Sequence, residues 1–248
     1  MPAFRAGEAL PASEGILIAV PDSAIPACAE PLALRLPKGC RVALHTSGLL
    51  PANAIAAIAR RGVAVASFHP LVSFATPTGA LVPLAGVLAA IEGEAAATRE
   101  SRRLARALGM RPFHLKAELK PQYHAAAALA ANLTHVLVAT ATDAMTKLGL
   151  PRRGAAAALR PLVGTAIAAA LSANGLERLT GPLARGDAQA VLAHLAALPP
   201  SAAAAYRAVA TLALPALSSQ HLVDPIRLLE IERALTKPRR CARFRPSM

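Results

Sequence analysis

The sequence is poor in aromatic side chains: Phe, Trp and Tyr together make up 3% of its 248 residues, and tryptophan is absent. The net charge of +13 would by itself favour a nucleic-acid partner. Six of the basic residues, however, fall within residues 233–248, so the other 232 residues carry only +7, which is 13 less 6. With so few aromatic residues, a platform on which bases could stack is also missing. We therefore predict no nucleic-acid partner.

Cysteine is equally scarce. The three cysteines, Cys28, Cys40 and Cys241, form no CxxC pair, and their number is odd. Zinc sites and disulfide frameworks need closely spaced or paired cysteines, so we predict no metal site and a reducing, cytoplasmic location. The first 15 residues also lack the apolar core of a secretory signal peptide.

Long hydrophobic runs are absent apart from one uncharged stretch, residues 121–142, which is about long enough to cross a bilayer. This stretch is rich in Ala rather than Leu, and it contains two His, an Asn and several Thr. Such a composition is typical of a helix that is buried inside a protein. We therefore predict no membrane partner.

Residues 15–118 alternate between strand patterns and helix patterns. The predicted strands are GILIAVPD, CRVALHTSG, VAVASFHPL, GVLAAIEG and RPFHLK, and the predicted helices cover 23–34, 51–62 and 94–109. This alternation predicts an α/β fold with a mostly parallel, doubly wound sheet. We assign residues 1–118 to a partial α/β domain.

After Lys120 the strand patterns end. A helical pattern covers residues 121–149, with Pro121 in its first turn and Gly149 at its end. Further helices are predicted within 151–175, 187–198 and 200–217. We assign residues 119–217 to an all-α domain and 218–248 to a basic, mobile tail.

Six short motifs occur in a fixed order between residues 15 and 217: ILIAVPDSAI, LHTSG, SFHPLVSF, AIEG, YHAAAALAAN and LTGPLARGD. This series resembles the Rossmann-like proteins that carry a DUF2520 C-terminal domain. The resemblance implies an NAD(P)-dependent oxidoreductase whose helical domain is similar to that of the 6-phosphogluconate and β-hydroxyacid dehydrogenases.

One feature that the resemblance implies is missing. Such a fold begins with a strand, a GxGxxG turn and a helix, and the glycines let the backbone approach the pyrophosphate of the cofactor. Here no two glycines are separated by a single residue, and the first strand pattern matches the family's fourth strand. We therefore expect an N-terminally truncated Rossmann-like sheet, a bare edge at its first strand, and weak NAD(P) binding by this chain.

The candidate cofactor residues lie at the predicted carboxyl ends of the strands, where open α/β sheets bind ligands. Six residues occupy the loops after the first two strands: Val20, Pro21, Asp22, Thr46, Ser47 and Gly48. The resemblance implies that these loops flank the nicotinamide. In the alternative interpretation, the Ser and Thr hydroxyls only stabilise a turn.

The third strand pattern ends at Ser67 and His69, before Pro70. Proline favours an extended conformation in the residue before it, which would fix the imidazole. Because His exchanges protons near neutral pH, His69 is a candidate for proton transfer and, with Ser67, for substrate binding. Alternatively, His69 is a buried residue that bonds to a neighbouring carbonyl.

Lys120, His124 and Asn132 belong to the first long helix. The related dehydrogenases place a catalytic Lys four residues before an Asn; if Asn132 is that Asn, the Lys position is Ala128. The resemblance then implies that Lys120 or His124 replaces the missing acid, whereas the alternative is a stripe of helix-packing residues. In TGPLARGD, Arg185 is a candidate for binding a substrate carboxylate or phosphate. The structural alternative is that Gly and Pro make a turn and that Asp187 caps the next helix.

Two functions follow from these patterns. The first is an NAD(P)-dependent oxidoreductase that acts on a small keto acid, hydroxy acid or related carbonyl compound, of which ketopantoate is one example. The second is a non-catalytic, truncated relic that serves as a helical dimerisation module without a cofactor. In both cases the Ala-rich helices predict a homodimer through residues 119–217, because their apolar surface needs a partner.

Overall fold

The computed structural model describes residues 10–74, 82–172 and 175–236. The chain divides into two compact units, Met1–Leu133 and Thr134–Met248. The division falls within the helical segment after Lys120, whereas the sequence placed a boundary between residues 118 and 119. The first turns of that segment pack with the sheet, and this packing moves the boundary towards the C-terminus.

The first unit contains a five-stranded sheet in the order β1-β2-β3-β4-β5. Its strands are β1 (Gly15–Ile18), β2 (Val42–His45), β3 (Ala64–Pro70), β4 (Leu88–Gly93) and β5 (Arg111–His114). All neighbouring strands are parallel except β3 and β4, which pair antiparallel. The predicted mostly parallel α/β sheet is therefore confirmed, and each strand lies within a run that the sequence identified.

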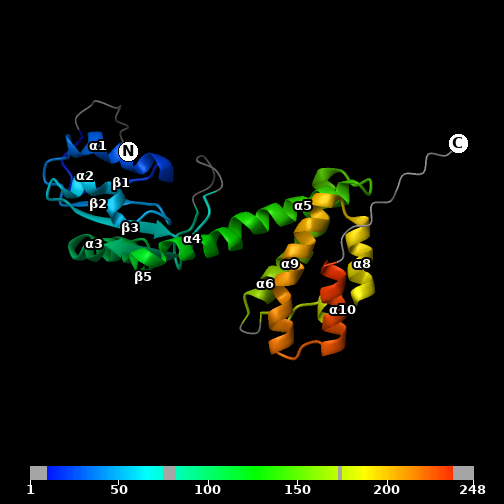
Figure 1. Ribbon diagram of the computed structural model, residues 1–248. Coiled ribbons are helices and arrows are strands. Elements are labelled where there is room, and N and C mark those ends of the chain that lie inside the picture. The colour runs from blue at the N-terminus through cyan, green and yellow to red at the C-terminus, as the bar shows by residue number, and fades with distance from the viewer. Residues whose placement is uncertain (1–9, 75–81, 173–174, 237–248) are drawn as a thin grey trace. The chain divides into compact units, whose positions relative to one another are not determined.

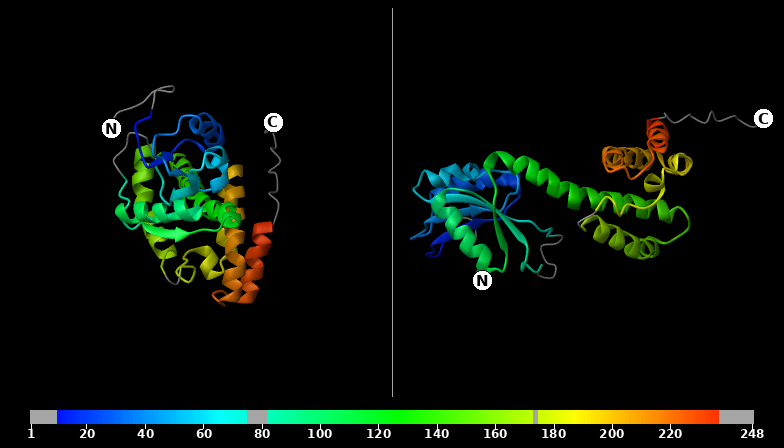
Figure 2. Two further views of the ribbon diagram at one scale, coloured as in Figure 1. Left: turned by 90° about the vertical axis from the view of Figure 1, so that its left-hand side faces the viewer. Right: turned by 90° about the horizontal axis from the view of Figure 1, so that it is seen from below.

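Helices cover both faces of the sheet (Figures 1 and 2). Alternate residues of the strands divide between two cores, because successive side chains of a strand point to opposite faces. Ala43 and Val65 pack with α1 (Ile25–Ala33) and α2 (Ala56–Ala59), whereas Leu44 and Ala66 pack with α3 (Ala95–Ala107). Short 3-10 turns, Asp22–Ala24 and Ala52–Ile55, precede α1 and α2.

Strand β1 lies at one edge of the described sheet, as the sequence predicted. Ile16 and Ile18 pack on the α1–α2 side, whereas Leu17 points to the other face and is 52% exposed. No charged residue or proline lies within the strand itself, and such residues are what usually protects an exposed edge.

One long helical run, Ala117–Thr146, follows β5. It contains α4 (Lys120–Ala128), a π-helical turn (Leu129–Leu133) and α5 (Thr134–Thr146). By length and composition the run could cross a membrane, with a mean hydropathy of 1.4, but only 6% of its most apolar window is buried. The expectation of a buried helix over 121–142 is therefore wrong for the single chain: Lys120 inserts among the strand ends and α5 packs with α6 (Arg152–Ala170), but most side chains of the run stay at least partly exposed.

The remaining helices belong to the second unit: α6 (Arg152–Ala170), α7 (Pro182–Arg185), α8 (Ala188–Ala197), α9 (Pro200–Ser219) and α10 (Pro225–Thr236). Asp187 caps α8, as predicted, by accepting a hydrogen bond from the Ala190 amide at 2.9 Å. The expected mobile tail from residue 218 is wrong for α10, which packs with α8 and α9 through buried Ile231 and Ala234 (Figure 1). Residues 237–248 lie outside the described residues.

Candidate functional site

Hydrogen bonds join the carboxyl ends of the first three strands. The Ser47 hydroxyl, just after β2, donates to the carboxylate of Asp22, just after β1, at 2.6 Å. The Ser67 hydroxyl, near the end of β3, donates to the Ser47 carbonyl at 2.9 Å. Both serines are buried. The loops that the sequence assigned to ligand binding are thus connected into one polar layer.

Lys120, the first residue of α4, inserts its ammonium group into this layer. Its Nζ donates to the Ser67 hydroxyl at 2.6 Å and to the Ser47 carbonyl at 3.2 Å, and its side chain is 1% exposed. Burial lowers the pKa of Lys120, while the charges of Glu92 and Asp22 oppose that shift. A lysine this deeply buried fixes α4 to the strand ends.

Three aromatic side chains lie next to this layer. His69 Nδ1 is 2.8 Å from the Tyr123 hydroxyl, and the two rings meet edge to face with centroids 5.6 Å apart. The rings of His69 and His124 are also perpendicular, with centroids 6.1 Å apart. In the described part of the chain, His124 Nδ1 is the one buried side-chain nitrogen or oxygen without a hydrogen-bond partner. Helix α4 therefore brings a second proton-carrying group against the end of β3.

Gly48 permits this close approach. A Cβ atom at residue 48 would lie 2.7 Å from His124 Nδ1 and 2.9 Å from His69 Nε2, both closer than non-bonded contact allows. Gly48 is therefore needed at this position for space rather than for an unusual backbone angle, and it lets the loop after β2 contact both imidazoles.

Replacing Gly48 with Ala should therefore disturb the site. We expect Gly48→Ala to lower the free energy of unfolding by about 1–3 kcal/mol, the usual cost of overpacking. Gly164→Ala is the matched control, because a Cβ there meets nothing within 4 Å and Ala favours a helix. Urea unfolding of both variants gives the comparison, and equal stability of Gly48→Ala and the wild type would contradict the contact.

Burial and the neighbouring charges keep His69 and Tyr123 uncharged at neutral pH. Burial, together with the charges of His124 and Lys120, lowers the pKa of His69 to about 4, while Asp22 opposes that shift. Burial raises the pKa of Tyr123 to about 12. At neutral pH, His69 is therefore an uncharged imidazole and Tyr123 a protonated phenol.

The lowered pKa of His69 predicts an acid-sensitive fold. Between pH 6.5 and about 4, His69 binds a proton in the unfolded chain but not in the folded chain. The free energy of unfolding therefore falls as the pH falls through this window. After allowance for partial exposure to solvent, we expect a loss of about 1–2 kcal/mol from this group. Urea unfolding at pH 7.0 and 4.5 should show that His69→Gln removes this part of the pH dependence. The exposed His114→Gln should not, and identical pH dependence in all three proteins would contradict the prediction.

The phosphate groups of a dinucleotide do not fit the loop after β2. Five of its backbone amides already donate hydrogen bonds within the fold: Thr46 to the Ile18 carbonyl, Ser47 to His45 Nδ1, Leu49 and Leu50 to the Ser47 hydroxyl, and Ala52 to the Glu92 carboxylate. The turn after β1 begins with Pro21, which has no N–H, and carries the Asp22 carboxylate. Free amides and the absence of negative charge are what an anion requires, so these two loops provide no pyrophosphate cradle.

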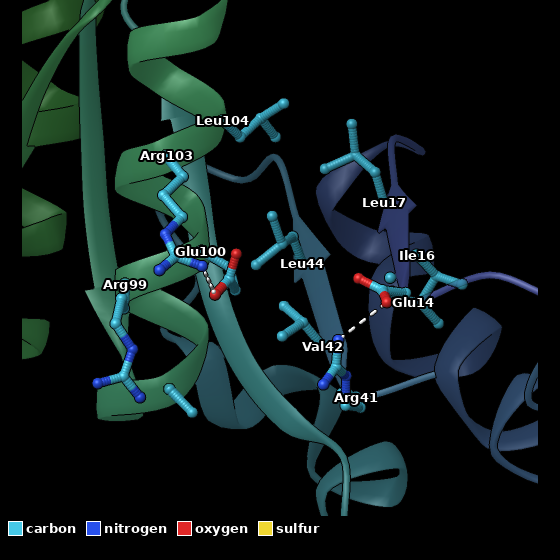
Figure 3. A pocket seen from close by; sticks show the side chains of 12 residues that line it. Glu14, Ile16, Leu17, Arg41, Val42, Leu44, Arg99, Glu100, Arg103 and Leu104 are labelled. Carbon is cyan, nitrogen blue, oxygen red and sulfur yellow. Dashed lines mark hydrogen bonds and ion pairs between the residues drawn. The ribbon is translucent and has the colours of Figure 1, made fainter. Parts of the chain in front are cut away.

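A separate groove of about 630 Å³ lies over β1 and β2 beside α3 (Figure 3). Leu17 and Leu44 form part of its apolar floor, and its rim carries the exposed ion pairs Arg41–Glu14 and Arg103–Glu100. None of the candidate residues lines it. This groove and the polar cluster at the strand ends are therefore separate features of the first unit.

The structure brings together most of the residues that the sequence selected. Asp22, Ser47, Gly48, Ser67, His69, Lys120 and His124 belong to the linked cluster described above. Thr46 contributes a backbone bond, Val20 packs against the α1–α2 core, and Pro21 begins the turn after β1. Asn132 is exposed in the π-helical turn, and Arg185 is exposed in the second unit.

Three residues of the cluster received no role of their own from the sequence: His45, Glu92 and Tyr123. Tyr123 directly precedes the candidate His124 in the sequence, and this position could have identified it as a site residue. His45 is fully buried, with Nε2 3.1 Å from the Pro51 carbonyl, and burial lowers its pKa. Nothing in the sequence pairs Glu92 with the Ala52 amide, 40 residues away.

A Rossmann-like α/β unit followed by a helical unit is the class of protein that this fold and site define. The family model for the domain of unknown function DUF2520 matches residues 87–213, just over half of the chain. The chain therefore belongs to the DUF2520 family.

Two solved structures share this fold. Protein TM1727 from Thermotoga maritima is 24% identical, with a TM-score of 0.68 over 85% of this chain and 81% of its own. BF3122 from Bacteroides fragilis, a candidate NADP oxidoreductase, is 21% identical, with a TM-score of 0.64 over 83% of this chain and 77% of its own. A comparison with curated protein sequences finds no match.

Proposed function

We propose that the strand ends and α4 form the substrate site of an NAD(P)-dependent oxidoreductase, which acts on a small keto acid, hydroxy acid or related carbonyl compound. The observation that carries this proposal is the gathering of His69, Tyr123 and His124 over the buried Lys120 layer. The likeness in fold to BF3122, a candidate NADP oxidoreductase, supports the choice of cofactor class.

The chemistry of such a site requires a proton for the carbonyl oxygen, because this oxygen gains negative charge as the carbonyl is reduced. His124 is suited to supply this proton, because its ring is only partly buried and lies beside the Gly48 loop. Lys120 does not contact the substrate in this proposal: it holds α4 against the strand ends and adds positive charge near the carbonyl oxygen of the substrate. Ser67 is fully buried, so it acts through Lys120 rather than on the substrate.

Replacing His124 tests this function. We expect the chain, at 10 mM NADPH and with pyruvate or 2-oxobutyrate, to form the corresponding hydroxy acid, detected as product by NMR spectroscopy. His124→Gln should lower the rate about 10²-fold, the usual contribution of a general acid. His114→Gln, at an exposed position on β5, is the matched control. Absence of product from a panel of small carbonyl compounds would overturn the proposal.

A second function is favoured by one observation, namely that the loops after β1 and β2 provide no pyrophosphate cradle. In this alternative the chain is a non-catalytic module that associates through its helices. The two functions differ in one result: only the oxidoreductase forms product that depends on both NADPH and His124.

In either case we propose a homodimer through the helical region. The run Ala117–Thr146 is apolar, and few of its residues are buried. Leu133 is 50% exposed and Val136 57% exposed, and Leu129 is 57% exposed. An uncovered apolar surface of this kind typically marks a protein interface, and a second copy would offer the same apolar helix.

A further inference from the structure

We propose that Tyr123 is a positioning residue that holds His69 as the tautomer with its proton on Nε2, so that His69 donates a neutral hydrogen bond to an oxygen of the bound substrate. The role towards substrate rests on the proposed function, whereas the tautomer does not. No residue pattern in the sequence pointed to this role for Tyr123.

The contact between Tyr123 and His69 determines which nitrogen carries the proton. The phenol keeps its proton at all ordinary pH values, because burial raises its pKa to about 12. Among the described residues, its hydroxyl has one hydrogen-bond partner, His69 Nδ1 at 2.8 Å. If Nδ1 were protonated instead, the phenol hydrogen would have no acceptor in a half-buried position, which costs free energy. The phenol therefore donates to Nδ1, and the one proton of the neutral imidazole is left on Nε2.

Several charged and titratable groups face His69 and decide whether the ring stays neutral. Lys120 and His124 on α4 disfavour the imidazolium form, and Asp22 in the turn after β1 favours it. Burial is the largest cause of the lowered pKa of His69, and the charges of His124 and Lys120 add to it, so the ring is neutral at pH 7. A neutral imidazole can polarise a carbonyl oxygen without giving up its proton.

The Nε2 side of the ring is the side available to a ligand. Nε2 lies beside Gly48 and has no hydrogen-bond partner in the described part of the chain, yet it is not among the buried atoms without a partner. Solvent therefore reaches it. A donor at this position selects a ligand with an acceptor oxygen, such as a carbonyl or carboxylate, over a ligand that presents N–H groups or a positive charge.

Nuclear magnetic resonance of the full chain labelled with ¹⁵N-histidine tests the tautomer directly. In the wild type we expect His69 to show a proton on Nε2 and an acceptor Nδ1 down to about pH 5. In Tyr123→Phe, which keeps the ring but loses the hydroxyl, the Nδ1 signal should lose its hydrogen-bond shift, and the two tautomers should exchange. The exposed His114 serves as the internal control. A proton on Nδ1 in the wild type, or an unchanged His69 signal in Tyr123→Phe, would overturn the proposal.

Titration with pyruvate tests the role towards substrate. The His69 Nε2 signal should shift as pyruvate binds, and Tyr123→Phe should lower kcat about five- to tenfold with little change in KM, which corresponds to the loss of one neutral hydrogen bond. An Nε2 signal that does not respond to pyruvate would overturn this role. Failure of the proposed function has a different signature: the Nε2 tautomer would be present, but no carbonyl compound would be turned over.

Discussion

Calorimetric titration of the purified chain with NADPH should give a Kd above about 1 mM, which corresponds to a binding free energy weaker than about −4 kcal/mol. The first physical reason is that the sequence has no GxGxxG turn to hold the pyrophosphate, and the second is that the loops after β1 and β2 do not replace it. The amides of Ser47, Leu49 and Leu50 already have acceptors, and the Asp22 carboxylate lies where a phosphate would need positive surroundings. A dinucleotide would have to break these bonds before its pyrophosphate could be held.

The conditions of this titration matter, because a chain with a net charge of +13 attracts any polyanion. At about 0.3 M salt such unspecific attraction is largely screened. Inorganic pyrophosphate under the same conditions is the control for binding that depends on charge alone. Micromolar affinity for NADPH, without comparable affinity for pyrophosphate, would contradict the prediction and would show that another loop holds the phosphates.

Light scattering should show a dimer of about twice the 25.4 kDa chain mass, and changing the uncovered helix should convert it to a monomer. In the double variant Leu133→Arg/Val136→Arg, two guanidinium groups would have to be buried without partners in the interface, which is costly. We expect the Kd of the dimer to rise at least about 10²-fold, or about 3 kcal/mol.

The control for this experiment is Leu34→Arg. Leu34 is 77% exposed at the end of α1, so it tests whether any exchange of an exposed leucine for a charge breaks the dimer. A wild-type chain that is a monodisperse monomer of 25.4 kDa would contradict the dimer. A double variant that stays dimeric would place the interface elsewhere.

The strands could be predicted because each is a short apolar run that ends near a turn residue. The antiparallel direction of β4 could not, since direction depends on tertiary pairing rather than on local pattern. Helix α10 has an amphipathic pattern, but the sequence analysis assigned it to the basic tail because of the many basic residues from 233 onward. Its buried residues Ile231, Ala234 and Leu235 recur at the three- and four-residue spacing of a helix face.

Which residues gather at the strand ends could be predicted in part, but their contacts could not. The rule that ligands bind at strand ends selected Ser47, Ser67 and His69 correctly as neighbours. The burial of Lys120 could not be foreseen, because lysine is usually exposed and its partners lie 73 and 53 residues away in the sequence. The exposure of the long helical run was also missed, since composition does not reveal whether a single chain can cover an apolar helix.

The most direct test of this site is to map where a small carbonyl compound binds. Backbone NMR spectra of the chain titrated with pyruvate should show the largest changes at Gly48, His69, Tyr123 and His124. Residues of the groove beside α3, such as Leu17 and Leu104, should change little. Changes concentrated in that groove, or no saturable change anywhere in the spectrum, would contradict the claim that the strand ends and α4 form the substrate site.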